Sequence, residues 1–245
     1  MAFARFEWMV AARYLRARRA EGFISVIAGF SLLGIALGVA TLIVVMSVMN
    51  GFRAELLGRI LGLNGHLRVH AADGFLQDYE RAADDLRRMD GVVRVTPIVE
   101  GQVMATANNQ AAGALVRGLK PKDLADDSVV GRSIVSGSLK DFEGEDAIVV
   151  GQRLAARMGV RVGDRLTLIS PQVSATAFGT VPRARAYRVA ATFEIGMFEY
   201  DSTFVFMPLN AAQIYFRAGA GVSGIEVMLA DADAAPRARR ASSRR

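Results

Sequence analysis

The chain has 245 residues, of which 52% are hydrophobic, and it contains no cysteine, so disulfide bonds are excluded. Its formal net charge of +6 is concentrated at the two ends, because the last ten residues contain five arginines and residues 1–22 carry a net charge of +3. The remaining residues, 23–235, carry a net charge of −2. The composition therefore predicts no broad basic surface, and we expect no nucleic-acid partner.

The first segment, residues 1–21, has the pattern of a short basic amphipathic helix. Apolar and aromatic residues recur at spacings of three and four from Phe3 to Tyr14, and arginines are interspersed up to Arg19. A basic amphipathic helix beside a membrane span lies in the interface, so we expect residues 1–21 to form a cytoplasmic interfacial helix. The alternative is a frayed leader whose arginines only act as stop-transfer charges.

The segment Gly22–Phe52 contains no charged residue, and it is longer than the roughly 20 apolar residues that a helix needs to cross a bilayer. One alternative is a buried core helix, but core helices seldom run this long without a charge. Another is a cleaved signal peptide, whose apolar region is about 7–15 residues long and ends in a small-x-small site that is missing here. We therefore expect a transmembrane helix over residues 22–52. The arginines before it place the N-terminus in the cytoplasm and residues from Arg53 onward outside.

Two glycines in this span, Gly34 and Gly38, form a GxxxG pattern. Small residues allow helices to approach closely in lipid, where the hydrophobic effect does not pull helices together. We expect Gly34 and Gly38 to pack against another membrane helix.

Short strands and helices alternate irregularly from His66 onward, so we predict an α+β domain over residues 53–233. The predicted strands are Leu67–His70, Val92–Thr96, Glu100–Thr106, Ala114–Leu119, Ala147–Val150, Leu166–Ser170, Tyr187–Ile195, Thr203–Met207 and Gly224–Leu229. The predicted helices are Glu55–Gly62, Tyr79–Met89, Gln152–Met158 with Gly159 as its stop, and Asn210–Phe216 with Asn210 as its N-cap. We expect the basic tail at residues 234–245 to be disordered.

Residues 171–182 form an uncharged segment between two predicted strands. Prolines bound the segment, and Phe178 and Val181 are its large apolar residues. Loops generally face water, so apolar residues at the tip of a loop would form an exposed patch that awaits a partner. The alternative is a hairpin that folds back onto its own domain.

The sequence offers no strong candidate for a catalytic or metal site. It lacks the P-loop pattern, which excludes ATP hydrolysis by a P-loop. His66 and His70 are four residues apart, a spacing that suits a metal on a helix but separates the side chains on a strand. Glu194, Glu199 and Asp201 are close in sequence without a histidine or cysteine, and we interpret them as surface carboxylates beside a turn. We predict a non-catalytic protein without metal or cofactor.

Two stretches together resemble a known family. Gly34–Phe52 reads GIALGVATLIVVMSVMNGF, and Phe193–Met207 reads FEIGMFEYDSTFVFM. Nearly the whole chain resembles the membrane subunit of the lipoprotein-releasing ABC transporter, the LolC/LolE group, within the wider MacB-like permeases. The resemblance implies an α+β fold in which a single N-terminal transmembrane helix precedes a MacB-like mixed α/β periplasmic domain.

The resemblance also implies a function and partners. Members lie in the bacterial inner membrane, where a second permease subunit (the same chain or a paralogue) and an ABC ATPase subunit complete the transporter. They pass lipoprotein cargo from the membrane to a periplasmic lipoprotein carrier. The family's hook, which grips the carrier, corresponds here to Pro171, Val173, Ala177, Phe178, Val181 and Pro182. Acyl-chain contact corresponds to Val45, Met46, Met49 and Phe52, although ordinary contact with membrane lipid or another helix is the alternative for the methionines.

Family members continue with further spans beyond the point that corresponds to Glu226, whereas this chain continues into its basic tail. We therefore expect a C-terminally truncated permease subunit. A non-transporting truncated fragment is one alternative. A MacB-like exporter or force-transmitting permease is a second, and a membrane-anchored sensor domain is a third.

Overall fold

The computed structural model describes residues 7–10, 13, 22–63, 65–71, 74–125, 129–176 and 179–230. The chain divides into two compact units, Met1–Gly58 and Arg59–Arg245. Residues 7–10 and 13 are helical. The rest of the expected interfacial helix and the expected disordered tail at 234–245 lie outside the described residues.

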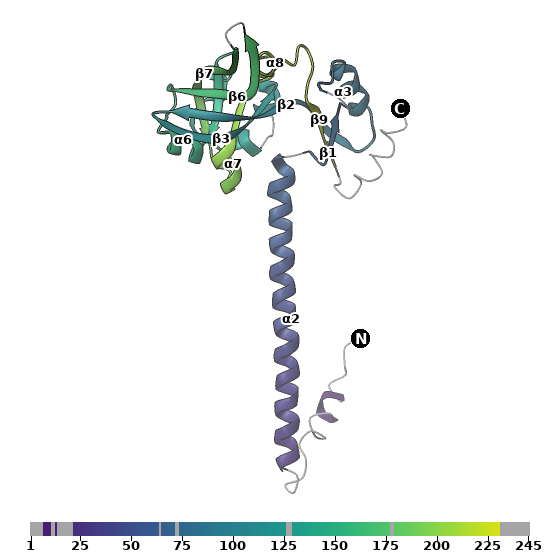
Figure 1. Cartoon of the computed structure of the whole chain (residues 1–245). Helices are drawn as coiled ribbons and strands as arrows, with labels where there is room; N and C mark the ends of the chain where they lie inside the picture. The colour runs from purple at the N-terminus through teal and green to yellow at the C-terminus, as the bar shows by residue number, and fades with distance from the viewer. Residues whose placement is uncertain are drawn as a thin grey trace. The chain divides into compact units, whose positions relative to one another are not determined.

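Helix α2 runs without interruption over 42 residues, Gly22–Leu63, and so includes the predicted extension beyond the span (Figure 1). Its stretch Val26–Arg53 is long and apolar enough to cross a membrane by length and composition, and none of that stretch is buried. At about 1.5 Å per residue these 28 residues reach about 42 Å, which exceeds a hydrocarbon core of about 30 Å. A helix of this length would tilt or protrude in a bilayer.

The second unit is built on a mixed sheet with short helices on its faces (Figure 1). Its strands in the described residues are β1 (Leu67–His70), β2 (Val92–Ala107), β3 (Gln110–Leu119), β4 (Ile134–Gly137), β5 (Ala147–Gly151), β6 (Arg165–Thr176), β7 (Gly179–Phe193), β8 (Phe204–Pro208) and β9 (Gly224–Leu229). The helices are α3 (Tyr79–Arg87), α4 (Pro121–Ala125), α5 (Val129–Arg132), the 3₁₀ turn η2 (Leu139–Asp141), α6 (Gln152–Met158), α7 (Phe198–Thr203) and α8 (Leu209–Phe216).

Six of these strands pair in a closed ring. β2 pairs with β3, β3 with β8, β8 with β5, β5 with β7, β7 with β6, and β6 pairs again with β2. The β3–β8 and β5–β7 pairs are parallel, and the other pairs in the ring are antiparallel. β9 and then β1 continue the sheet from β2, and β4 pairs with β7. Closing a sheet in this way removes free edges that an open sheet would expose.

Buried apolar side chains lie on both faces of the strands, because alternate residues of a strand point to opposite faces. On β5, Ile148 belongs to a cluster that helices α6 and α8 complete, whereas the next residue, Val149, belongs to a second cluster. The second cluster also contains Leu124 of α4 and Val130 of α5. The rings of Phe193 and Phe206 meet edge to face there, with centroids 5.4 Å apart.

The predicted bounds of β1, α6 and β9 match those of the structure. Gly159 ends α6 as predicted, with a left-handed φ of +62°. The N–H groups of Gly159 and Val160 donate to the carbonyls of Ala156 and Ala155, so the helix end is satisfied internally.

The two strands predicted at Val92–Thr96 and Glu100–Thr106 are one strand, β2, which continues through Pro97. β2 pairs with β9 up to Ile98 and with β3 from Val99. Proline has no N–H group to donate to a neighbouring strand. Pro97 precedes the residues of β2 that pair with β3, so no hydrogen bond to β3 is lost there.

The prediction of Asn210 as an N-cap is wrong. α8 begins at Leu209 after an extended Pro208, and no side chain caps it. No local pattern indicated β4, η2, α4, α5 or α7. Each of these has six residues or fewer, and periodicity is a weak signal in so short a segment.

Candidate functional site

Those expected hook residues that the structure describes lie on the paired strands of the β6–β7 hairpin rather than on an open loop. The strands continue past Pro171 and Pro182, with Val173 opposite Pro182 and Ser174 opposite Val181. Pro171 and Pro182 are exposed, whereas Ala177 and Phe178 lie outside the described residues, as do the side chains of Val173 and Val181. Prolines are compatible with a strand at edges and bulges, which is why they do not end these strands.

A bulge and an arginine define the base of the β6–β7 hairpin. The register passes from Ile169 opposite Ala184 to Val173 opposite Pro182, so β6 has two more residues than β7 over this interval. Bulges of this kind bend a strand pair and increase its twist. Opposite the bulge, the Arg183 guanidinium donates to the carbonyls of Ile214 (3.1 Å) and Tyr215 (2.6 Å) at the C-terminal end of α8. The hairpin is thus anchored to α8 at its base.

The expected acyl-chain residues share one face of α2. Val45, Met49 and Phe52 follow at spacings of four and three, and Met46 adjoins them. All four side chains are more than half exposed. Gly34 and Gly38 lie earlier on the same helix, and a Cβ added at either would meet nothing within 4 Å. These residues and the β6–β7 hairpin belong to separate compact units.

Asp201 corrects the interpretation of the acidic group as surface carboxylates. Its side chain is fully buried and accepts hydrogen bonds from the backbone N–H groups of Ile195 (2.9 Å) and Gly196 (3.1 Å). These bonds close the turn between β7 and α7. Glu194 and Glu199 are exposed, as expected. A carboxylate that serves its own local backbone has a structural role.

His66 and His70 likewise bond to backbone. The Leu229 N–H donates to His66 Nδ1 at 3.1 Å, and His70 Nδ1 lies 3.2 Å from the Ser223 carbonyl oxygen. No group of three or more possible metal-ligating side chains occurs within the described part of the chain.

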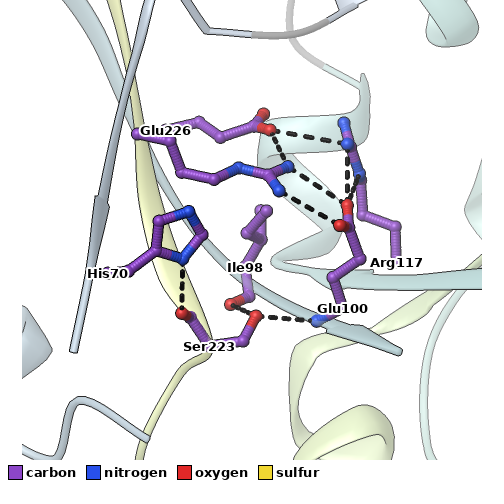
Figure 2. Close-up of polar contacts among 7 residues, drawn as sticks. His70, Ile98, Glu100, Arg117, Ser223 and Glu226 are labelled. Carbon is purple, nitrogen blue, oxygen red and sulfur yellow. Dashed lines mark hydrogen bonds and ion pairs between the residues drawn. The ribbon is translucent and has the colours of Figure 1, made fainter. Parts of the chain in front are cut away.

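Four charged side chains that sequence reasoning missed gather where β1, β9, β2 and β3 lie side by side (Figure 2). Arg68 lies opposite Glu226 in the β1–β9 pair, and Glu100 lies opposite Arg117 in the β2–β3 pair. We call these residues the four-charge cluster. Its members are spread over more than 150 residues of sequence, so no local motif could have indicated them.

Each carboxylate of the four-charge cluster contacts both guanidinium groups. Arg68 forms a fork with Glu100 (Nη1–Oε1 3.0 Å, Nη2–Oε2 3.1 Å) and also donates to Glu226. Arg117 donates from Nε and Nη2 to Glu100 Oε2 (3.1 and 2.8 Å), and its Nη2 lies 3.4 Å from Glu226 Oε1. Arg117 is 4% exposed and Glu226 is 8% exposed. Two positive and two negative charges therefore neutralise one another in a largely buried position.

The surroundings fix this geometry. The Arg117 guanidinium carbon lies 5.4 Å from the centre of the Phe204 ring. The Glu100 N–H donates to Ser223 Oγ (2.8 Å), and Ser223 Oγ in turn donates to the Ile98 carbonyl (3.0 Å), as Figure 2 shows. Burial alone would raise the pKa of Glu100, but the hydrogen bonds and positive charges of Arg68 and Arg117 outweigh it and lower that pKa. The cluster joins β1, the strand that follows α2, to β2 and β3.

We expect Glu100→Gln to flatten the acid dependence of stability. Because the pKa of Glu100 is lower in the folded state, its contribution is fully present above its ordinary pKa of about 4.3 and is lost as pH falls through the lowered value. Thermal unfolding of the detergent-solubilised chain at a series of pH values should show wild type and variant converging in acid. Glu145→Gln, whose carboxylate is half exposed, is the control and should follow the wild type throughout. Parallel curves for wild type and Glu100→Gln would contradict the expectation.

The family model of the MacB-like periplasmic core domain matches residues 28–244. The chain belongs to the MacB-like periplasmic core domain family. The MacB-like domain follows one N-terminal apolar helix, as the sequence predicted, and the α+β fold is confirmed.

Relatives of this member of the MacB-like family confirm the resemblance to lipoprotein-releasing permeases. The lipoprotein-releasing system transmembrane protein LolC of Neisseria meningitidis is 32% identical over 94% of this chain and 56% of its own length. The LolC protein of Xylella fastidiosa strain Temecula1 is 34% identical over 90% of this chain and 53% of its own length. The chain thus spans about half the length of these relatives. A crystal structure of the periplasmic region of MacB from Actinobacillus actinomycetemcomitans aligns with a TM-score of 0.45 and 16% identity, over 72% of this chain and 80% of that chain.

Proposed function

We propose that the chain is a membrane subunit of an ABC transporter that releases lipoproteins from the inner membrane to a periplasmic carrier. The similarity to LolC proteins along at least nine-tenths of the chain carries this proposal. In it, ATP is hydrolysed on a separate ATPase subunit, and a second permease subunit completes the membrane part. The chain itself has no catalytic role.

The proposed location is the bacterial inner membrane, with the N-terminus in the cytoplasm and the second unit in the periplasm. Five arginines precede α2 within about 20 residues, where positive charge is retained on the cytoplasmic side. The apolar, unburied surface of α2 supports a membrane span. The exposed face that carries Val45, Met46, Met49 and Phe52 would then contact the acyl chains of the cargo.

The β6–β7 hairpin is the proposed contact with the carrier. Its base is anchored by Arg183, and its strands extend beyond the bulge. An anchored base would limit the ordering cost when a partner binds the hook segment 171–182.

Contiguous pairings support a mechanical role for the second unit. β1 follows α2 in sequence, the four-charge cluster joins β1 to β2, and β2 pairs with β6 at Met104–Thr106. In the proposed mechanism, ATP hydrolysis moves α2, and this path passes the motion to the β6–β7 hairpin. To demonstrate this coupling, a change in α2 must be shown to alter the β6–β7 hairpin, or the reverse.

Phe178→Asp combined with Val181→Asp should lower affinity for the periplasmic carrier at least tenfold. Two charges placed at an apolar contact must be desolvated without partners, which costs well over the roughly 1.4 kcal/mol that a tenfold change requires. The measurement is capture of the purified carrier by the chain assembled with its ATPase and partner permease.

The matched control for this test is Val93→Asp, which makes the same change at an exposed valine of β2. Carrier binding should survive it. Equal carrier capture by the hairpin variant and the wild type would contradict the assignment of the hairpin. A wild-type assembly that captures no carrier would instead favour a MacB-like exporter or another force-transmitting permease.

A further inference from the structure

A pocket of about 430 Å³ lies beside α6, and its described lining includes no residue of the hook segment 171–182 or of the four-charge cluster. It is bounded by α6, the turn that follows it, and the paired strands β4 and β7. Ala155, Val160 and Val162 form part of its apolar wall. Ligand pockets in proteins have volumes of about 300–1,000 Å³, so this one is large enough for a small ligand.

One lining residue, Thr192 of β7, has an unsatisfied buried hydroxyl. Thr192 is 3% exposed, and its Oγ1 has no hydrogen-bond partner. Most buried polar side chains have such a partner, and leaving one unpaired is unfavourable. Thr192 pairs with Ser136 of β4 and Val150 of β5, so both neighbouring strands hold its position.

Each polar side chain that lines the pocket can donate a hydrogen bond. Besides Thr192 they are Ser136, Gln152 and Arg161, and the described residues that line the pocket include no carboxylate. In the described part of the chain, the Arg161 guanidinium has no ion-pair partner. The structure gives Asp164, the nearest acid in sequence, a different role, because its carboxylate accepts from the Arg161 backbone N–H at 2.8 Å.

The backbone carbonyls at the C-terminal end of α6 already accept hydrogen bonds from within the domain. Asn108 Nδ2 donates to the carbonyls of Met158 (3.0 Å) and Gly159 (2.9 Å). The carbonyls of Ala155 and Ala156 accept from the turn that ends the helix. These acceptors are therefore satisfied, and the pocket presents one guanidinium, two hydroxyls and an amide against an apolar wall.

We propose that this pocket binds a phosphate group carried on a short apolar stem. A phosphate offers several acceptor oxygens to Arg161, Thr192 and Ser136, and an apolar stem matches the alanine and valine wall. A phospholipid headgroup and a free phosphate ester share this chemistry. The site goes beyond the proposed function and does not depend on it, because no residue of the hook segment 171–182 or of α2 takes part.

The test is calorimetric titration of the full chain in a non-ionic detergent. The probes are butyl phosphate, a short-chain phosphatidylglycerol and inorganic phosphate. We expect the two probes with apolar stems to bind at least tenfold more tightly than inorganic phosphate. The tighter of the two indicates whether the ligand is a soluble ester or a lipid headgroup. Failure of all three to bind would overturn the proposal.

Two variants distinguish binding in the pocket from nonspecific attraction of the phosphate to positive charge on the surface. Thr192→Val keeps the shape and removes the orphan hydroxyl, so it should weaken butyl phosphate binding about tenfold, while the melting temperature without ligand stays equal or rises. Arg161→Gln should weaken binding to a similar extent. Arg165→Gln changes an exposed arginine outside the pocket and should leave binding unchanged. Binding that is insensitive to Thr192→Val, or equally sensitive to Arg165→Gln, would overturn the proposal.

Discussion

Arg117→Ala should lower the free energy of unfolding of the second unit by about 3–5 kcal/mol. The substitution leaves the carboxylates of Glu100 and Glu226 with one guanidinium instead of two, and removing one partner from a buried ionic network has an effect of this size. It also removes the cation above the Phe204 ring. For a domain of this size the melting temperature should fall by about 6–20 °C, which far-UV circular dichroism of the detergent-solubilised chain would measure.

The matched control is Arg157→Ala on α6. Arg157 is exposed, and alanine is the best helix former, so stability should change by less than about 0.5 kcal/mol. If Arg117→Ala shifts stability no more than this control, the four-charge cluster would be solvated in solution and could not hold β1 against β2.

Gly118→Ala should destabilise the second unit by about 2–3 kcal/mol. A Cβ at position 118 on β3 would lie 2.1 Å from the Cβ of Ala212 on α8, so the helix must move away from the strand. Ala212→Gly removes the obstructing atom and costs about 1 kcal/mol in helix propensity. The double variant should therefore be more stable than Gly118→Ala alone. The measurement is a double-mutant cycle by thermal unfolding.

Gly113→Ala serves as the control on the same strand. A Cβ at position 113 would meet nothing within 4 Å. Because alanine restricts the unfolded chain more than glycine does, stability should be unchanged or slightly higher. If Gly118→Ala behaves like Gly113→Ala, or if Ala212→Gly fails to restore stability, α8 would not pack on β3 as described.

Local pattern predicted the elements whose sequence signals are self-contained. The strands β1 and β9 follow from the alternation of Leu67 with Val69 and of Ile225 with Val227, Gly159 marks the end of α6, and the charge-free run indicated α2. The prediction failed where a distant partner decides the outcome. β2 continues through Pro97 because β9 and β3 pair with different parts of it, and nothing in residues 92–107 indicates that arrangement.

The candidate site likewise combines features that local sequence indicates with features that only the tertiary structure determines. The prolines and apolar residues at 171–182 singled out a segment, but its pairing as a hairpin and the anchoring of Arg183 on α8 depend on tertiary structure. The four-charge cluster and the orphan Thr192 hydroxyl are invisible in the sequence. Arg68 and Glu226 meet only through the pairing of β1 with β9, and the Thr192 hydroxyl lacks a partner only because of its burial.

The sheet path ends in β1 and β4, which have four residues each and are its shortest strands. A strand this short offers a foreign chain few backbone groups for recognition, and edge-to-edge association between molecules scales with the length of edge available. If two such subunits stand close together in a membrane, their domains can slide or separate without fusing into a continuous intermolecular sheet. The brevity of these two strands would then preserve the independent movement of neighbouring copies.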